Sequence, residues 1–316
     1  MSTIKIGISA CLLGTKVRFD GGHKKDSFLT GTLSDYFEWV PVCPEVEVGM
    51  STPRESLRLV GDAESPRMVT TKTGLDWTDR MNQYAHKRIA DLENMDLSGY
   101  ILKSKSPSCG MERVRVYTDK GMPTKKGQGL FAKVLADAMP DLPMEEEGRL
   151  HDPRIRENFI TRVFCYYRWQ TLAKAGRVTM RDLTEFHARH KFLIMAHSET
   201  HMREMGRLLA KTKAYTPAEM MESYGVLFFE ALARKTTVRR HVNVLEHIAG
   251  FFKKEISTND RTELQQAIDD YHNGLLPLIV PMTLLRHHTR NLEVSYIQEQ
   301  IYLHPHPKEM MLLNHV

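Results

Sequence analysis

Apolar and polar residues follow two alternating patterns along the first half of the chain. Short apolar runs rich in Ile, Val and Tyr are typical of strands, and segments with an apolar residue every three or four positions are typical of amphipathic helices. The predicted strands cover residues 5–10, 39–42, 99–103 and 114–117. The predicted helices cover residues 27–37, 78–95 and 129–139. Strands and helices that alternate in this way predict an α/β domain with an open, mainly parallel sheet.

Beyond residue 148 the pattern changes to long segments of helical periodicity in which Gly and Pro are sparse. Many of these segments begin with Asp, Thr or Pro, which are favoured at the first positions of helices. The predicted helices cover residues 152–175, 179–211, 216–233, 237–252, 258–273 and 278–289. Residues 141–148 combine Pro, Gly and an acidic run, which is typical of a linker. We therefore expect a Rossmann-like α/β domain over 1–148 and an all-α domain over 149–316.

Charge is distributed unevenly between the two predicted domains. Residues 1–148 carry 20 Lys and Arg against 21 Asp and Glu, a net charge of −1, whereas residues 149–316 carry 24 against 18, a net charge of +6. An excess of positive charge favours a phosphate-bearing partner, although a well-solvated helical surface has the same composition. The densest basic cluster is expected to contact phosphates, or to be a solvated helix junction, and it contains Arg234, Lys235, Arg239 and Arg240.

The sequence contains no signal for export or membrane insertion. The start of the chain lacks the long apolar core of a signal peptide, and the longest apolar stretch, 275–285, contains two prolines and is too short to span a bilayer. Four cysteines in 316 residues, without a secretory signal, indicate reduced thiols and a cytoplasmic location. Reduced thiols are available to bind metal.

Three of the four cysteines share one position in the sequence pattern. Cys11, Cys43 and Cys109 each follow a β-prone run and stand close to Gly or Pro, so each is expected at the carboxyl end of a strand. Because those ends lie along one edge of a parallel sheet, the three thiols are expected to meet in one pocket. Three thiolates can hold an iron-sulfur cluster by three of its irons and leave the fourth iron open. The spacing matches no zinc or ferredoxin motif, so packing as small buried hydrophobes is the alternative.

Polar residues near these cysteines are candidates for acid-base chemistry. Glu45 stands two residues after Cys43, where it can act as a general base, although an exposed loop carboxylate fits the same sequence. Three alternating serines, Ser104, Ser106 and Ser108, precede Cys109. Their hydroxyls can pass a proton or satisfy backbone groups of a turn.

Two further segments are suited to anions. Arg18 and Asp20 lie in a Gly-containing loop that resembles an anion-holding turn. Lys125 and Lys126 precede a predicted helix, whose first backbone amides can hold a phosphate. The glycine spacing there does not match a dinucleotide fingerprint.

Four histidines recur at helical spacing between residues 187 and 201. His187, His190, His197 and His201 are separated by three, seven and four residues, which places most of them near one helix face. This arrangement permits a zinc site or contacts with RNA, but packing between helices is the more common role.

Five short motifs in the first half of the chain are characteristic of a known family. They are Ile-Ser-Ala-Cys-Leu-Leu-Gly, Val-Arg-Phe-Asp-Gly-Gly, Pro-Val-Cys-Pro-Glu-Val, Gly-Met-Ser-Thr-Pro-Arg and Lys-Ser-Pro-Ser-Cys-Gly. Through them residues 1–145 resemble the TudS-like thiouracil desulfidases. The second half resembles the YbgA-like helical domain, for example in His-Val-Asn-Val-Leu-Glu-His. The two domains together resemble bacterial desulfidases that act on 4-thiouridine in tRNA.

The resemblance implies a specific site and reaction. It implies that Cys11, Cys43 and Cys109 hold a 4Fe-4S cluster, that Glu45 and Ser106 assist catalysis, and that the helical domain helps to bind tRNA. The reaction would be a non-redox desulfuration of 4-thiouridine to uridine with release of sulfide, which needs no nucleotide cofactor. The alternatives are a desulfidase of free thiouracil or thiouridine nucleotides, a cluster-dependent hydro-lyase, and an RNA-binding or redox-sensing protein.

Overall fold

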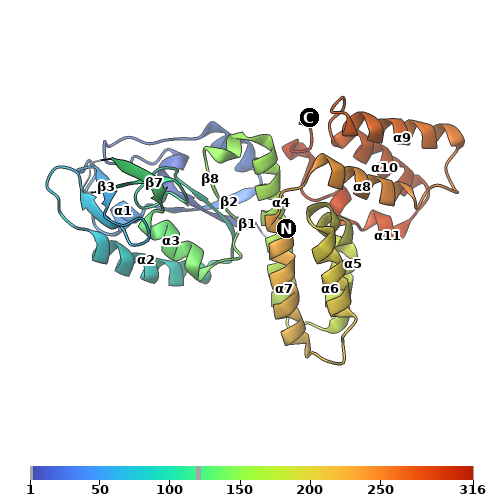
Figure 1. The fold of residues 1–316 in the computed structure, drawn as a ribbon, viewed down its shortest axis with the longest axis horizontal. Coiled ribbons are helices and arrows are strands. Elements are labelled where there is room, and N and C mark those ends of the chain that lie inside the picture. The colour runs from blue at the N-terminus through green and yellow to red at the C-terminus, as the bar shows by residue number, and fades with distance from the viewer. Residues whose placement is uncertain (1–2, 119–121, 316) are drawn as a thin grey trace. The chain divides into compact units, whose positions relative to one another are not determined.

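The computed structural model describes residues 3–118 and 122–315, which form two compact units (Figure 1). The first unit ends at Asp152 and the second begins at Pro153. The first unit combines sheets and helices, and the second is helical, so the predicted fold class is confirmed. No helix in the described ranges is both long and apolar enough to cross a membrane.

The first unit is built on a parallel sheet in the strand order β2-β1-β5-β8. Its strands are β1 (Ile4–Ser9), β2 (Phe37–Val42), β5 (Leu97–Leu102) and β8 (Met144–Glu146). The central strands are almost completely buried, as expected for parallel strands covered on both faces. Helices α2 (Thr78–Glu93) and α3 (Leu130–Ala138) pack against each other, and Phe131 of α3 contacts Tyr100 of β5. This packing sets the position of the loops that follow the strands.

The acidic segment 141–148 is not a linker, and this prediction is wrong. Residues 144–146 form the edge strand β8, in which Glu145 and Glu146 are 9% and 7% exposed. Arg149 donates to Glu145 at 2.6 Å, and the backbone N–H of Met111 donates to Glu146 at 2.9 Å. Carboxylates are rarely buried without such partners, and the backbone of Met111 is brought close to Glu146 only by the tertiary fold.

A second sheet has the order β4-β3-β6-β7, with one parallel pair, β3 with β6, between two antiparallel pairs. Its strands are β3 (Leu57–Val60), β4 (Arg67–Thr70), β6 (Val114–Tyr117) and β7 (Pro123–Gly127). The predicted strand 114–117 therefore exists but belongs to this second sheet. The predicted helix 27–37 is reduced to a π-helix at Leu29–Leu33, because Thr and Gly in this segment disfavour a longer helix.

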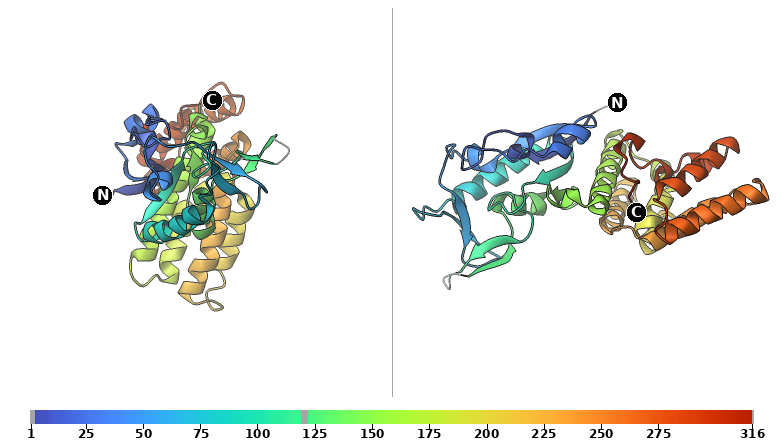
Figure 2. Two further views of the ribbon diagram at one scale, coloured as in Figure 1. Left: turned by 90° about the vertical axis from the view of Figure 1, so that its left-hand side faces the viewer. Right: turned by 90° about the horizontal axis from the view of Figure 1, so that it is seen from above.

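The second unit consists of helices joined by short loops. They are α4 (Pro153–Lys174), α5 (Met180–His197), α6 (Glu199–Leu209), α7 (Pro217–Ala233), α8 (Val238–Ala249), α9 (Thr258–His272), α10 (Ile279–Asn291) and the short α11 (Ser295–Gln298). Figures 1 and 2 show α5, α6 and α7 side by side. The predicted helix 179–211 is two helices, because Ser198 adopts an extended conformation and caps α6 through a bond from the N–H of His201.

Candidate active site

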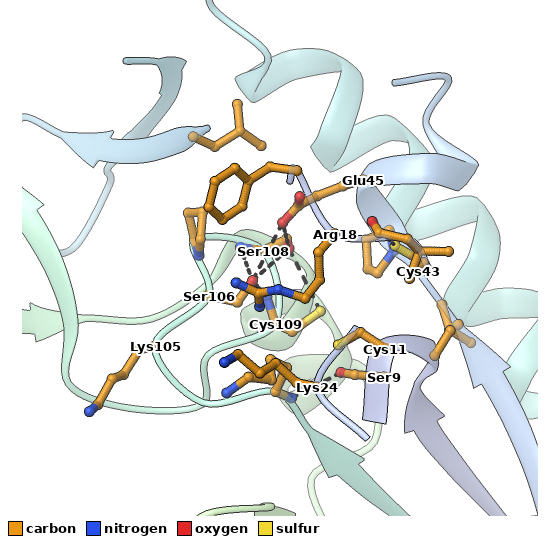
Figure 3. Close-up of a pocket in the computed structure, with 18 of the residues that line it drawn as sticks. Ser9, Cys11, Arg18, Lys24, Cys43, Glu45, Lys105, Ser106, Ser108 and Cys109 are labelled. Atoms are coloured by element: carbon orange, nitrogen blue, oxygen red, sulfur yellow. Dashed lines mark hydrogen bonds between the residues drawn. The ribbon is translucent and has the colours of Figure 1, made fainter. Parts of the chain in front are cut away.

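A pocket of about 370 Å³ lies at the carboxyl ends of β1, β2 and β5 (Figure 3). Three segments contribute most of its lining, namely residues 9–11, 42–45 and 103–109. From β1 to β2 the chain moves toward one edge of the sheet, and from β5 to β8 it moves toward the opposite edge. Connections that diverge in this way open a crevice at the strand ends, which is the usual ligand position in such sheets.

Three cysteine side chains line this pocket, one from each segment. Cys11 and Cys109 are 9% and 5% exposed, and Cys43 is partly buried. None of them forms a disulfide, and Figure 3 shows all three at the same cavity. The fourth cysteine, Cys165, is fully buried in the helical core of the second unit and is not among the residues that line the pocket.

The environment of the thiols disfavours a negative charge. Burial, and then the proximity of Cys43, raises the pKa of Cys11 to about 11. Burial also raises the pKa of Cys43, and burial and then Glu45 raise the pKa of Cys109. Three thiolates at this position would be stabilised by bound metal cations, whose positive charge offsets the repulsion between them.

The donor set is compatible with a metal cluster. Across residues 3–118 and 122–315, no three His, Cys, Asp or Glu side chains are grouped closely enough to hold one metal ion. In an iron-sulfur cluster each cysteine binds a different iron, so the ligands stand further apart than around one ion. Three unpaired thiols around one cavity fit that requirement.

Glu45 reaches the pocket from α1 (Pro44–Glu47), a one-turn helix that begins directly after Cys43. Arg54 holds this carboxylate: its Nε donates to Oε2 of Glu45 at 3.1 Å, and its Nη2 bonds the same oxygen. The side chains of Arg54 and Glu45 are only 6% and 15% exposed. Sequence reasoning assigned no role to Arg54, although it ends the motif Gly-Met-Ser-Thr-Pro-Arg.

Two serines continue from Glu45 toward the cysteines. The hydroxyl of Ser108 donates to Oε1 of Glu45 at 2.7 Å, whereas that of Ser106 is 3.5 Å from the same oxygen. The two hydroxyls are 3.0 Å apart. Ser106 Oγ also accepts from the backbone N–H of Cys109 at 3.2 Å. The structure therefore links Ser106, Ser108 and Glu45 in one hydrogen-bonded chain, with Ser108 closest to the carboxylate.

The loop that carries Cys109 rests on the start of α3. The N–H groups of Gly129 and Leu130 donate to the carbonyls of Gly110 and Pro107 at 2.8 and 3.1 Å. A Cβ atom on Gly129 would lie 2.5 Å from the carbonyl oxygen of Ser108, so glycine permits this close approach.

The same contacts bear on the phosphate contact predicted at the start of this helix. The N–H groups of Gly129, Leu130 and Ala132 are bonded to loop carbonyls, so fewer amides are available to an anion than the sequence suggests. Lys125 and Lys126 are exposed on strand β7 and are not among the residues that line the pocket.

Positive side chains surround the pocket. Arg18, Lys24, Lys103 and Lys105 line it, and Lys103 is paired with Glu147. Asp20 lies outside the lining, 3.6 Å from Arg18, and a hydrogen bond from the N–H of Gly22 lowers the pKa of this carboxyl. Arg18 therefore faces the pocket, and Asp20 belongs to the turn beside it.

The predicted basic cluster of the second unit divides into two kinds of residue. Arg234, Lys235 and Arg239 are exposed, as a phosphate contact requires. Arg240 instead donates to the carbonyls of His197 and Lys235 at 2.9 and 3.1 Å, so it connects the end of α5 to the loop before α8.

The histidine row does not form a zinc site within the described residues. Each imidazole has a separate partner: Tyr224 for His187, the Phe186 carbonyl for His190, the Arg234 carbonyl for His197 and Ser198 for His201. The helical spacing therefore reflects packing between helices.

Comparison with known proteins divides the chain in two. Residues 6–147 match the 2-thiouracil desulfurase family, and residues 191–307 match a family described as a protein of unknown function, DUF1722. The chain is similar to the uncharacterized protein YbbK of Bacillus subtilis (strain 168), with 32% identity over 136 residues, 42% of this chain and 89% of YbbK. It is also similar to the uncharacterized protein YbgA of Escherichia coli (strain K12), with 26% identity over 160 residues, 50% of this chain and 94% of YbgA.

A solved structure is also similar to part of the chain. It is the [4Fe-4S]-dependent thiouracil desulfidase TudS, with 29% identity and a TM-score of 0.39, and the match covers 48% of this chain and 95% of that one.

Proposed function

Since the chain belongs, through residues 6–147, to the 2-thiouracil desulfurase family, we propose that it removes sulfur from a thiolated pyrimidine. The observation that carries this proposal is the pocket itself. Three unpaired thiols and a carboxylate bonded to a serine line one cavity at the strand ends. A cluster-binding donor set beside a general base is what hydrolytic removal of sulfur needs.

Cys11, Cys43 and Cys109 hold a 4Fe-4S cluster in this proposal. When bound, such a cluster supplies one iron with an open position, a Lewis acid that prefers a soft thiocarbonyl sulfur. The net reaction converts C=S and water into C=O and hydrogen sulfide, so no electrons are transferred and no nucleotide cofactor is required.

Glu45 is the proposed general base. Arg54 occupies its Oε2, which leaves Oε1 on the side of the pocket where the serines lie. A water bonded to this carboxylate gives it one proton as the water oxygen attacks the carbon that carries sulfur. Because Arg54 fixes the carboxylate in a largely buried position, the base is oriented before substrate arrives.

Ser106 and Ser108 are proposed to move the second proton. Their hydroxyls form a chain to Glu45, along which a proton can pass toward the pyrimidine ring or the leaving sulfur. The sequence resemblance points to Ser106, and the shorter bond to Glu45 points to Ser108. A relay through both hydroxyls accommodates the two observations.

We propose 4-thiouridine in tRNA as the substrate. The support is the net charge of +6 on residues 149–316 and the exposed side chains of Arg234, Lys235 and Arg239. The pocket has room for a single base rather than for folded RNA, so a target base must leave its stack, at a cost of roughly a few kcal/mol. Phosphate contacts can offset this cost. Free thiouracil or its nucleotides are the alternative substrates.

The first experiment tests the base and the cluster. We expect anaerobically reconstituted Glu45→Gln to keep the iron content and visible absorption of the wild type, while sulfide release falls at least ~100-fold. Glu93→Gln removes an exposed carboxylate of α2 outside the pocket and serves as the matched control. Undiminished turnover in Glu45→Gln, or full iron content in Cys43→Ser, would contradict the proposal.

The second experiment tests the substrate. Rates on thiolated tRNA and on 4-thiouridine monophosphate are compared between the wild type and a variant in which Arg234, Lys235 and Arg239 are all replaced by Gln. The proposal expects slower reaction with tRNA and an unchanged rate with the mononucleotide. An equal effect on both substrates, or none, would remove RNA from the proposed function.

A further inference from the structure

The second unit contains a pocket of its own, with a volume of about 1420 Å³. Its lining comes from α4, α10 and the carboxyl-terminal segment between residues 293 and 314. Apolar side chains of Phe164, Ile279 and Leu303 form part of the wall. A cavity of mixed polarity and this size is suited to an organic ligand with charged groups.

Unpaired positive charge is concentrated in this pocket. Arg168, Arg286, Arg290 and Lys308 line it, against two carboxylates, those of Glu293 and Glu309. In the part of the chain that the structure describes, none of these four cations forms an ion pair with a carboxylate. Four cations against two acids leave a charge of +2, which an anion can neutralise.

Two residues that line this pocket each carry a nitrogen that is covered from solvent and has no hydrogen-bond partner within bonding geometry, namely Nη1 of Arg168 and Nε2 of His306. The Arg168 guanidinium also interacts with the thiol of Cys165. The other side of each group is fixed, because Arg168 Nη2 donates to the carbonyl of Pro305 at 2.7 Å and His306 Nδ1 lies 3.2 Å from the carbonyl of Pro307. Buried polar atoms are almost always satisfied, so the two nitrogens favour a ligand in the pocket for which the atoms that cover them move aside.

The chemistry of the two nitrogens differs. A carbonyl can only accept, so the bond to Pro307 places the proton of His306 on Nδ1 and leaves Nε2 as an acceptor. Burial, and then Arg168 and Arg286, lowers the pKa of His306 to about 4, so the ring is neutral at pH 7. The pocket therefore combines guanidinium donors for an anion with an imidazole acceptor for a hydroxyl group.

We propose that this pocket binds a ribose phosphate, with Arg168, Arg290 and Lys308 on the phosphate and Nε2 of His306 accepting from a ribose hydroxyl. Guanidinium groups match the oxygens of phosphate, and the apolar wall accommodates a base. The ribose phosphate is either a free nucleotide or a unit of an RNA strand. The site lies wholly in the second unit, so it does not depend on the desulfidase chemistry proposed above.

Calorimetric titration of the full chain with uridine 5′-monophosphate tests the site. Arg290→Gln combined with Lys308→Gln removes two exposed charges and leaves the backbone bond of Arg168 intact. We expect this double variant to bind at least about tenfold more weakly. Arg261→Gln, an exposed arginine of α9 outside the pocket, is the matched control and should change affinity less than about twofold.

The ribose contact has its own comparison. We expect 2′-deoxyuridine 5′-monophosphate to bind more weakly than the ribonucleotide, and His306→Leu to remove that preference. Short single-stranded RNA and DNA of the same sequence are titrated in parallel, in case the ribose phosphate is recognised only within a strand.

The titrations distinguish a free nucleotide from an RNA strand as the ligand, and both from the absence of a binding site. Mononucleotide binding that the double variant loses supports a free nucleotide, and RNA-only binding that the double variant loses supports an RNA strand. Absence of both, or equal binding by the wild type and the double variant, overturns the proposal. Sulfide release from thiolated tRNA and from 4-thiouridine monophosphate is measured with the reconstituted wild type, because its absence would contradict the desulfidase proposal alone and leave the nucleotide site standing.

Discussion

Acid should unfold the second unit of this protein before the first, because four histidines of the second unit are buried without charge. His190, His197, His241 and His306 are each less than a tenth exposed. Burial lowers the pKa of His190 and His241 to about 3, and that of His197 and His306 to about 4. In an unfolded chain the same groups titrate near pH 6.5, so the unfolded state takes up protons first as the pH falls.

The size of the effect follows from the difference in bound protons. Stability from these groups is complete above pH 6.5 and is lost as the pH falls toward 4. At pH 5.5 each histidine costs about 1.4 kcal/mol, and four together cost about 5 to 6 kcal/mol. Glu157 acts in the opposite sense, because burial raises its pKa to about 7. Lowering the pH to 5.5 therefore removes about 2 kcal/mol of the destabilisation that its buried charge causes. The net loss of about 4 kcal/mol is a large part of the 5 to 15 kcal/mol typical of a domain.

Tryptophan fluorescence can report the two units separately. Trp169 lies in α4 of the second unit, whereas Trp39 and Trp77 belong to the first. A variant with Trp39→Phe and Trp77→Phe is unfolded with urea at pH 7.5 and at pH 5.5. The free energy of unfolding reported by Trp169 should fall by about 4 kcal/mol at the lower pH.

The complementary variant, Trp169→Phe, reports the first unit and is the control. This unit contains only three histidines, His23, His86 and His151, so its stability should change much less between the two pH values. An unchanged transition at Trp169 would show that these imidazoles are not buried as neutral groups, and would refute the reasoning.

Three further predictions concern the first unit. Arg54→Gln leaves the largely buried carboxylate of Glu45 without a counter-charge and should lower the free energy of unfolding by about 3 kcal/mol, measured in urea; a change below about 0.5 kcal/mol would mean that the pair contributes nothing. Gly129→Ala should lower the iron bound per chain, because the new methyl group collides with the Ser108 carbonyl. Gly31→Ala is the control and should leave the iron content unchanged, because no atom lies within 4 Å of its new methyl group. Equal iron content in both variants would contradict this prediction. Chelation of iron should stop sulfide release. It should leave the far-ultraviolet circular dichroism intact, because the sheet has its own apolar core. Loss of the helical and strand signal would show that the cluster is required for folding.

Much of the architecture could be read from local patterns. Strands β1, β2 and β5 are short apolar runs, and α2 and α7 have the periodicity and end signals of helices, so their residues were sufficient to predict them. The change of pattern beyond residue 148 likewise predicted the all-α character of the second half. The position of three cysteines after strands predicted a shared pocket, because parallel strand ends always lie on one edge.

The remaining features depend on contacts that no local pattern of residues shows. Residues 144–146 look like a solvent-exposed linker until Arg149 and the backbone of Met111 satisfy their carboxylates. Arg54 lies in the loop after α1, nine residues from Glu45, and its role becomes visible only where the two side chains meet.

The sequence by itself determined the fold class and the kinds of chemical group at the site, because both follow from local periodicity and residue type. Only the tertiary structure decided which groups touch, including the bond of Ser108 to Glu45 and the unpartnered nitrogens of the second pocket. The physical reason is that hydrogen bonds and ion pairs act over a few ångströms, and chain folding alone brings such distant residues that close.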